Sequence, residues 1–345
     1  MNASVVVRGS GSIGQRHARV FRQVGADVSL WPVRDRGVGP DASDHAVDAA
    51  TGARLLGDAS GPAAVRDALV VIATDTSRHV TDALAALDAG AGAVLVEKPV
   101  APTAGDARVL EEHPRRAAVW VAAPLRAHAA FRHVRRLVGR LQQGGSAHVW
   151  SQSWLPDWRP DRDYRESYSA RVDEGGVLRD LVHEIDYATV LFGTPVLLGA
   201  SVATEGPLDI DADQAATLLW RAGRFDVTTR LDYITRPTTR GLVVRTPDGV
   251  VEWDVVRASV RHTAPGGEVM EQVFEHDLDR DIVMGTQARA ALDLRPTAPE
   301  DERLARGAPA TLADGVATVR LCDAARAAGH RPLVATTSDR PEEAP

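Results

Sequence analysis

One lysine stands alone among the basic residues of this chain. Lysine and arginine together number 40, and Lys98 is the single lysine. A compact ammonium on a flexible stem is not equivalent to a planar guanidinium, so a lone lysine predicts a site that needs this group. Lys98 follows the apolar run 93–96, where a buried strand would end, and open α/β sheets bind ligands beyond such ends. The alternative is that one lysine escaped a codon bias toward arginine.

Asp180 and His183 form a second candidate site. They lie three positions apart in the periodic segment 177–192, so on a helix they share a face. Histidine exchanges protons near neutral pH, and a carboxylate can orient its ring. From the spacing alone, a solvated polar face is an equally good interpretation. The apolar stripe of the segment lies on the other side and consists of Leu178, Leu181, Val182, Ile185 and Phe192.

A glycine-rich turn joins the first apolar run to a helical segment. Residues 9–14 read G-S-G-S-I-G, which is the G-x-G-x-x-G pattern in its required position between a strand and a helix. The glycines allow a tight turn, close approach of a pyrophosphate and close packing of helix on strand. The helix start then offers unpaired amides to the phosphates. The residues expected to contact a dinucleotide here are Gly9, Gly11, Ser12, Ile13 and Gly14.

The end of the second strand bears on the choice of cofactor. A site for NAD(H) places an acidic residue about 20 positions beyond the turn, to bind the ribose 2′-hydroxyl. Here Arg34 stands twenty residues after Gly14, and an arginine can pair with a 2′-phosphate. The sequence therefore favours NADP(H) over NAD(H). Asp35 keeps NAD(H) open, and Arg34 could also be a plain loop charge.

The elements that must position these residues fall into two groups. Short apolar runs at 4–7, 28–30, 69–73, 93–96 and 118–121 alternate with helical segments, which predicts a parallel sheet. Later segments predict a largely antiparallel sheet, with a hairpin turn at 247–249. Its expected strands are 197–204, 214–221, 225–233, 241–246 and 250–261, and the helices around it are 177–192 and 313–328.

Composition limits the classes of function. The 345 residues suffice for two domains, and the net charge of -7 does not indicate a nucleic-acid partner. Cys322 is the one cysteine, so the chain is expected in a reducing compartment, with Cys322 in the core. We see no signal peptide, no membrane span and no zinc-type ligand set, and expect a cytoplasmic protein without a metal site.

Taken together, the motifs resemble those of the Gfo/Idh/MocA family of NAD(P)-dependent sugar and cyclitol oxidoreductases. The resemblance rests on the glycine turn, on 72–74 with His79, on 97–99, and on 125–126, 175–186 and 314–315. It implies an α/β protein: a Rossmann domain over 1–124 and an α/β domain over 125–336 with an open, mostly antiparallel sheet. The last helix would pack back toward the first domain, the tail 337–345 would be disordered, and a homo-oligomer (dimer or tetramer) is implied.

The resemblance also assigns roles to residues. Lys98 would lie next to the nicotinamide, with a cis bond to Pro99, and Thr74, His79 and Glu97 would line the cofactor. Oxidising a secondary alcohol needs a base for the hydroxyl proton and a positive group at the developing alkoxide. We assign these parts to His183 and Lys98, with Asp180 orienting His183. Many family members space the last two by four residues rather than three, which puts the geometry of Asp180 in doubt.

Aromatic and charged residues crowd the segment 154–169. Such a mixture suits a polyhydroxylated ligand, since rings cover a sugar's apolar face and charged groups bind its hydroxyls; a subunit interface has a similar composition. The leading interpretation is a dehydrogenase or ketoreductase of a sugar, aminosugar or cyclitol, with aminoglycosides and sugar nucleotides included. The alternatives are a regulator that senses cofactor or sugar, and an NAD-dependent glycosidase. The expected substrate contacts are Arg126, Trp158, Arg165 and Tyr168.

Overall fold

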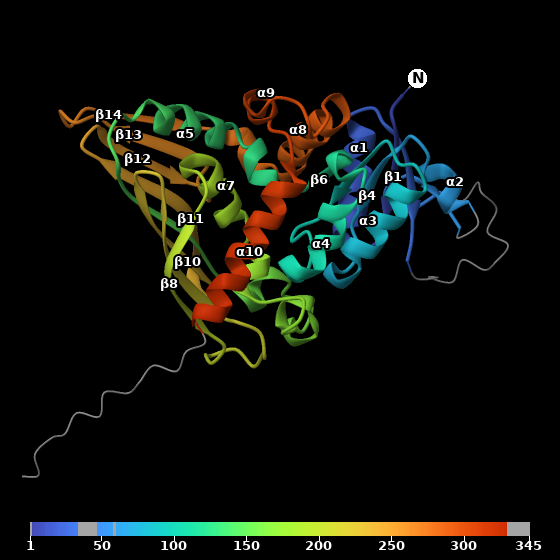
Figure 1. The fold of residues 1–345 in the computed structure, drawn as a ribbon, viewed down its shortest axis with the longest axis horizontal. Helices are drawn as coiled ribbons and strands as arrows, with labels where there is room; N and C mark the ends of the chain where they lie inside the picture. Colours follow the sequence, from blue (N-terminus) through green and yellow to red (C-terminus); the bar gives the residue numbers. More distant parts are fainter. Residues whose placement is uncertain (1, 34–46, 58–59, 330–345) are drawn as a thin grey trace, which may run out of the picture.

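The computed structural model describes residues 2–33, 47–57 and 60–329. Two sheets stand at opposite ends of the molecule, with helices between and around them (Figure 1). The predictions for Arg34, Asp35 and the tail 337–345 lie outside the described residues.

The first sheet has the order β15-β6-β5-β4-β1-β2-β3, and its pairs are parallel except β15 with β6. Its central strands are buried on both faces, as their unbroken apolar runs predict. Because β1, β4 and β5 are neighbours, the glycine turn, Thr74 and Lys98 come to one edge. The strands are β1 (Ser4–Arg8), β2 (Asp27–Trp31), β3 (Arg54–Leu55), β4 (Leu69–Ile72), β5 (Ala93–Val96), β6 (Val119–Val121) and β15 (Ala310–Thr311).

Helices cover this sheet, and one of them comes from the distant C-terminal part. α8 packs along α1 (Figure 1), so the fold around the glycine turn includes residues beyond 124. Thr103 and Asp106 cap the start of α4 reciprocally, which satisfies its first amides. The helices are α1 (Ser12–Gln23), α2 (Gly61–Val65), α3 (His79–Asp88), α4 (Ala104–Glu112) and α8 (Arg280–Asp293).

The second sheet has the order β14-β13-β12-β11-β7-β10-β9-β8 and is antiparallel except for β7 with β10. The predicted mostly antiparallel sheet is thus confirmed, as is the hairpin turn, since Thr246 pairs with Gly249. The strands are β7 (Gly145–Trp154), β8 (Val196–Ala203), β9 (Ala215–Ala222), β10 (Phe225–Asp232), β11 (Ile234–Thr246), β12 (Gly249–Asp254), β13 (Ser259–Thr263) and β14 (Val269–Val273).

Several strand predictions in this sheet were wrong. The segment 250–261 is two strands joined by a turn at 255–258, β11 begins at 234 rather than 241, and β7 and β14 were not predicted. Ser151 and Ser153 occupy buried positions of β7, so the apolar alternation that marks a strand is weak there.

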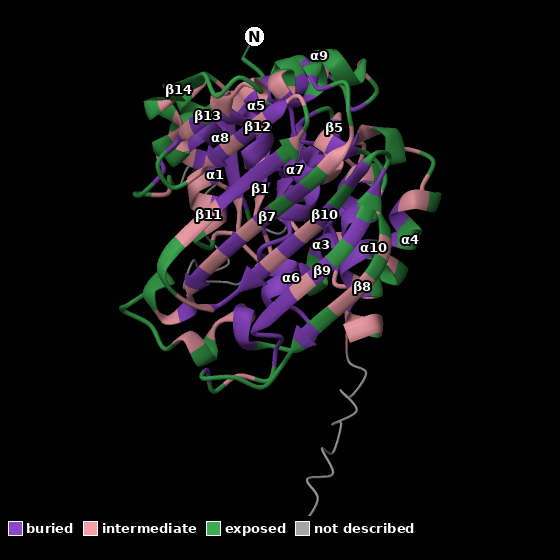
Figure 2. Ribbon diagram, turned by 90° about the vertical axis from the view of Figure 1, so that its left-hand side faces the viewer, coloured by how far each residue is buried: buried purple, intermediate pink, exposed green. Residues whose placement is uncertain are grey.

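Helices lie on one face of the second sheet, toward the first sheet (Figure 1), and Figure 2 looks onto the other face, where buried and exposed residues alternate. α10 connects the two sheets, since it contacts β6 of the first sheet and β8 of the second. The helices are α5 (Ala129–Arg140), α6 (Val177–Asp180), α7 (His183–Phe192), α9 (Glu300–Ala305) and α10 (Leu312–Gly329). Short 3₁₀ helices are η1 (Thr76–Arg78), η2 (Arg116–Ala118), η3 (Pro124–Ala127), η4 (Leu155–Trp158), η5 (Tyr164–Glu166), η6 (Tyr168–Ala170) and η7 (Glu275–Leu278).

The predicted continuous helix 177–192 is broken. α6 ends at Asp180 and α7 begins at His183, and Leu181 has φ -97° and ψ 25°. Asp180 and His183 therefore do not share the face of one helix, and both carry side chains that are largely enclosed rather than solvated.

Candidate active site

The three glycines of the turn are glycines for different reasons. Gly9 has φ +107°, and a Cβ there would lie 2.5 Å from the carbonyl oxygen of Ala73. A Cβ on Gly14 would lie 2.1 Å from the carbonyl oxygen of Gly9. Gly11 has an ordinary backbone, with φ -69°, and a Cβ there would meet nothing within 4 Å. The protein itself thus does not require glycine at 11, whereas a pyrophosphate approaching the start of α1 does.

Thr74 and His79 follow β4 at the same edge. The Thr74 hydroxyl oxygen is buried without a hydrogen-bond partner among the described residues. It can therefore form a hydrogen bond with a bound ligand. His79 is different, because its Nδ1 lies 2.8 Å from the carbonyl oxygen of Pro99 and its Nε2 3.1 Å from that of Thr74. Buried between two backbone carbonyls, His79 positions Thr74 and Pro99 rather than facing an open cofactor cleft.

Glu97 and Lys98 follow β5. His17 of α1 lies 2.6 Å from a Glu97 carboxylate oxygen. Burial raises the pKa of Glu97, but His17 and Lys98 outweigh burial and hold that pKa below its usual value. The bond from Lys98 to Pro99 is cis, as expected. Glu97 is thus an anion fixed between the helix of the glycine turn and the lysine.

The Lys98 ammonium points at the break between α6 and α7. Its Nζ donates to the carbonyl oxygen of Asp180 at 3.0 Å and lies 3.7 Å from Asp180 Oδ1. The break makes this possible, because the amide of Glu184 bonds the carbonyl of Leu181 instead. An ammonium has three donors, so at least one remains for a ligand.

Asp180 does not orient His183, contrary to expectation. Its Oδ2 accepts a hydrogen bond from the Tyr233 hydroxyl at 2.6 Å, and its buried Oδ1 has no hydrogen-bond partner in the described part of the chain. The helix break turns Asp180 toward Lys98 and away from the start of α7. Asp180 is therefore placed to hold Lys98.

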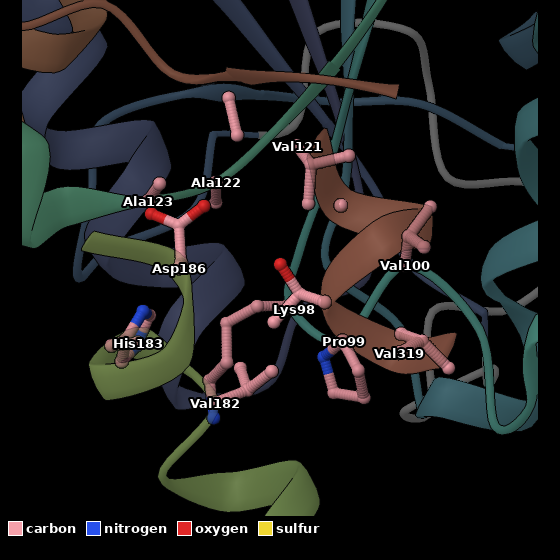
Figure 3. Close-up of a pocket in the computed structure, with 13 residues that line it drawn as sticks. Lys98, Pro99, Val100, Val121, Ala122, Ala123, Val182, His183, Asp186 and Val319 are labelled. Atoms are coloured by element: carbon pink, nitrogen blue, oxygen red, sulfur yellow. The ribbon is translucent and has the colours of Figure 1, made fainter. Parts of the chain in front are cut away.

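His183 and Lys98 line the same small pocket of about 20 Å³, whose other lining residues are mostly apolar. Figure 3 shows it together with Asp186, one helical turn further along α7. Burial lowers the pKa of His183 well below 6.5, and the positive charges of Lys98 and Arg240 lower it further. His183 is therefore neutral at pH 7 and can accept a proton.

Sequence reasoning missed the partners of these residues. Tyr233 holds Asp180, and Glu184, which is fully buried, makes a two-pronged ion pair with Arg240 at 2.5 and 2.9 Å. Each pair joins residues more than 50 positions apart, and nothing local in the sequence indicated them.

Two of the four expected substrate contacts line a common pocket, and the other two do not. Trp158 and Tyr168 line a second pocket of about 460 Å³ beside Asp75, which follows β4. Burial raises the pKa of the Tyr168 hydroxyl, and the carboxylate of Asp180 raises it further, so this pocket adjoins the residues around Lys98. The Trp158 ring packs edge-on against Tyr233 at 5.4 Å and donates its N–H to Ser153.

Arg126 and Arg165 do not face this pocket. Arg126 is 2% exposed, and its guanidinium binds Asp186 and Asp314, so it joins η3, α7 and α10 rather than awaiting a substrate. Arg165 is held on the surface by Asp163. Cys322 is buried, and burial raises its pKa to about 12.

Within the described ranges, 2–33, 47–57 and 60–329, no three His, Cys, Asp or Glu side chains cluster as metal ligands, and no helix is long and apolar enough to span a membrane.

Residues 3–124 match the model of an oxidoreductase family with an NAD-binding Rossmann fold. Among solved structures, UDP-N-acetylglucosamine 3-dehydrogenase GnnA from Acidithiobacillus ferrooxidans is 16% identical, with a TM-score of 0.73 over 95% of this chain and 98% of that one. Levoglucosan dehydrogenase in complex with NADH is 16% identical, with a TM-score of 0.77 over 95% and 97%. An oxidoreductase domain protein from Kribbella flavida is 17% identical, with a TM-score of 0.75 over 95% and 97%. No curated protein matches the sequence. At these identities the structures show a shared fold.

Proposed function

We propose that this chain, whose residues 3–124 belong to the Gfo/Idh/MocA oxidoreductase family, transfers a hydride between a nicotinamide dinucleotide and a secondary alcohol or ketone of a sugar, aminosugar or cyclitol. The observation that carries the proposal is that Lys98, which follows β5 in the sheet that also bears the glycine turn, donates to Asp180 and lines one pocket with His183. A binding protein that only sensed a sugar would need no neutral base beside a fixed ammonium.

The three side chains divide the work. In the direction of oxidation, neutral His183 takes the proton of the substrate hydroxyl. Lys98 holds the same oxygen and stabilises its growing negative charge, as a preorganised donor does. Asp180 fixes the ammonium through its carbonyl and carboxylate. In reduction, His183 first takes up a proton from solvent and then gives it to the substrate oxygen, while Lys98 polarises the carbonyl.

The dinucleotide fits the residues that would hold it. Gly11 leaves open space at the start of α1, and the Thr74 hydroxyl is buried and free. When bound, the nicotinamide supplies or accepts the hydride. Gly9, Gly11, Ser12, Ile13, Gly14, Thr74 and Glu97 would surround it.

NADP(H) is the preferred form in this proposal. The support is in the sequence, where Arg34 stands at the distance at which NAD(H) sites carry an acid. Arg34→Asp is expected to lower kcat/KM for NADP(H) by at least tenfold and to leave that for NAD(H) within a few-fold. Steady-state kinetics with both cofactors check this, and an unchanged ratio would return the choice to NAD(H).

The substrate has its polyhydroxylated part against Trp158 and Tyr168. Aromatic faces together with several carboxylates and guanidinium groups line that pocket, and such a lining binds both the apolar and the hydroxylated sides of a sugar ring.

The test is absorbance at 340 nm on mixing the protein with NAD⁺ or NADP⁺ and pooled cyclitols, aminosugars, aminoglycosides and sugar nucleotides. We expect a rise with at least one pool and none with Lys98→Met. Reduced cofactor with the corresponding ketones tests the other direction. No change in either direction across the pools, from protein that binds the cofactor, would contradict the proposal.

A further inference from the structure

Arg280, the first residue of α8, is a cation without a partner. Its side chain makes no hydrogen bond or ion pair with any residue that the structure describes. The adjacent carboxylate of Asp281 is already occupied, because Arg19 binds it at 3.0 and 2.9 Å and Arg16 lies at 3.6 Å. The guanidinium of Arg280 therefore keeps its full hydrogen-bonding capacity.

Arg280 lines an open cleft together with Arg16 and Arg19 of α1. Its charge also interacts with those of Glu97 beyond β5, Arg240 of β11 and His183. α8 lies along α1 (Figure 1), which begins at the turn. Arg280 is thus a residue of the C-terminal part that reaches the dinucleotide edge of the first sheet.

Around the Arg280 guanidinium, positively charged side chains outnumber the carboxylates that are not already paired. The protein packed around Arg280 lowers the pKa of its guanidinium, and the positive charge of Arg16 lowers it further. Glu97 already accepts from His17, and Asp279 accepts two backbone amides at the start of α8. Glu275, the first residue of η7, also lines the open cleft between α1 and α8, and its carboxylate makes no hydrogen bond or ion pair with the residues that the structure describes. An anionic group of a ligand would supply the negative charge that Arg280 lacks.

We propose that Arg280, together with Arg16, binds the pyrophosphate of the dinucleotide from the side opposite the glycine turn, an inference that rests on the proposed function. Arg16 stands in the second turn of α1, two residues after Gly14, and its guanidinium lies 3.6 Å from Asp281 in the cleft that Arg280 also lines. Guanidinium groups bind phosphate oxygens in pairs of parallel hydrogen bonds. Arg280 would approach the same phosphates from α8, and the C-terminal part of the chain would help to hold the cofactor.

ADP-ribose is the direct probe, because it carries the pyrophosphate and lacks the nicotinamide. Isothermal titration gives its Kd for the wild type, Arg280→Gln, Arg280→Lys and the control Arg289→Gln. Arg289 is exposed on the same helix, further from the turn. We expect Arg280→Gln to weaken binding at least tenfold, as loss of a charge-assisted hydrogen bond does. Arg280→Lys should lose less, and Arg289→Gln should stay within twofold.

Other outcomes have definite meanings. An unchanged Kd in Arg280→Gln, with an unchanged melting temperature, overturns the inference. If the KM of phosphate- or carboxylate-bearing substrates rises instead, the anion belongs to the substrate. Equal weakening in Arg280→Gln and Arg289→Gln would indicate a general effect of helix charge and would overturn it too. A wild type that binds neither ADP-ribose nor NADPH would refute the proposed function itself.

Discussion

At the scale of single residues, substitutions at Gly11 and Gly14 test cofactor binding and folding separately. Gly11→Val adds side-chain atoms into open space, so the free energy of unfolding should change by less than about 1 kcal/mol. The same atoms would block the pyrophosphate, so the Kd of NADPH should rise more than tenfold. Fluorescence titration and urea unfolding measure the two effects.

Gly14→Ala is the matched variant. Its Cβ would meet the Gly9 carbonyl at 2.1 Å, so it should lower the free energy of unfolding by about 1–3 kcal/mol, as overpacking does. Full cofactor affinity in Gly11→Val would contradict the proposed position of the pyrophosphate.

His183 gives a pH dependence whose sign follows from its surroundings. Burial and the positive charges of Lys98 and Arg240 lower its pKa below 6.5, and oxidation requires the neutral ring. The kcat/KM for oxidation should therefore rise with pH and level off, with its midpoint below 6.5. His183→Gln should lower kcat/KM by about 10²–10⁴ and remove this rise. A midpoint above 6.5, or one that persists in His183→Gln, would exclude His183 as the base.

Site residues could be predicted from the sequence where the residue type or the neighbouring sequence marks them. Lys98 stands out by its type and by the strand before it, and the glycine turn by its spacing. The role of Asp180 was not predictable, because its partners Lys98 and Tyr233 are 82 and 53 positions away.

At the scale of elements, the break between α6 and α7 creates the site. A continuous helix would use the Asp180 carbonyl for its own hydrogen bond, whereas the break leaves that oxygen to Lys98. Apolar periodicity runs through both helices, which is why the sequence predicted one helix.

Arg126 fixes three elements around this break. It is buried and binds Asp186 of α7 and Asp314 of α10 from its place in η3. Arg126→Met would leave two carboxylates without their partner, so the free energy of unfolding should fall by about 3–5 kcal/mol.

Urea unfolding of Arg126→Met beside Arg165→Gln measures this effect. Arg165 makes an exposed ion pair, so its loss should cost about 1 kcal/mol or less. A stable Arg126→Met enzyme with a raised KM would restore Arg126 as a substrate contact.

At the scale of the whole molecule, the second sheet offers one face without helices (Figure 2). Leu219 of β9 is 45% exposed on the sheet, and its neighbours Leu218 and Trp220 are buried. We propose that this face pairs with a second copy of the chain. Leu219→Arg should then shift the mass in light scattering from a dimer or tetramer toward a single chain. A monomeric wild type would contradict this.

The way the chain is shared between the two sheets could be predicted only in part. Alternating apolar runs indicate the parallel sheet, and the turn residues indicate the antiparallel one. The chain returns to the first sheet through α8 (Figure 1) and through β15, which pairs with β6. This return depends on contacts between residues far apart, such as Arg19 with Asp281. Local patterns carry no such information.

The most direct measurement is a single turnover followed at 340 nm, with saturating cofactor and a substrate from the reactive pool, for the wild type and Lys98→Met. Losing the ammonium at the reacting oxygen should slow hydride transfer by at least about 10², while the Kd of the cofactor stays within a few-fold. A rate equal to that of the wild type would show that Lys98 is not the group that acts on the substrate oxygen.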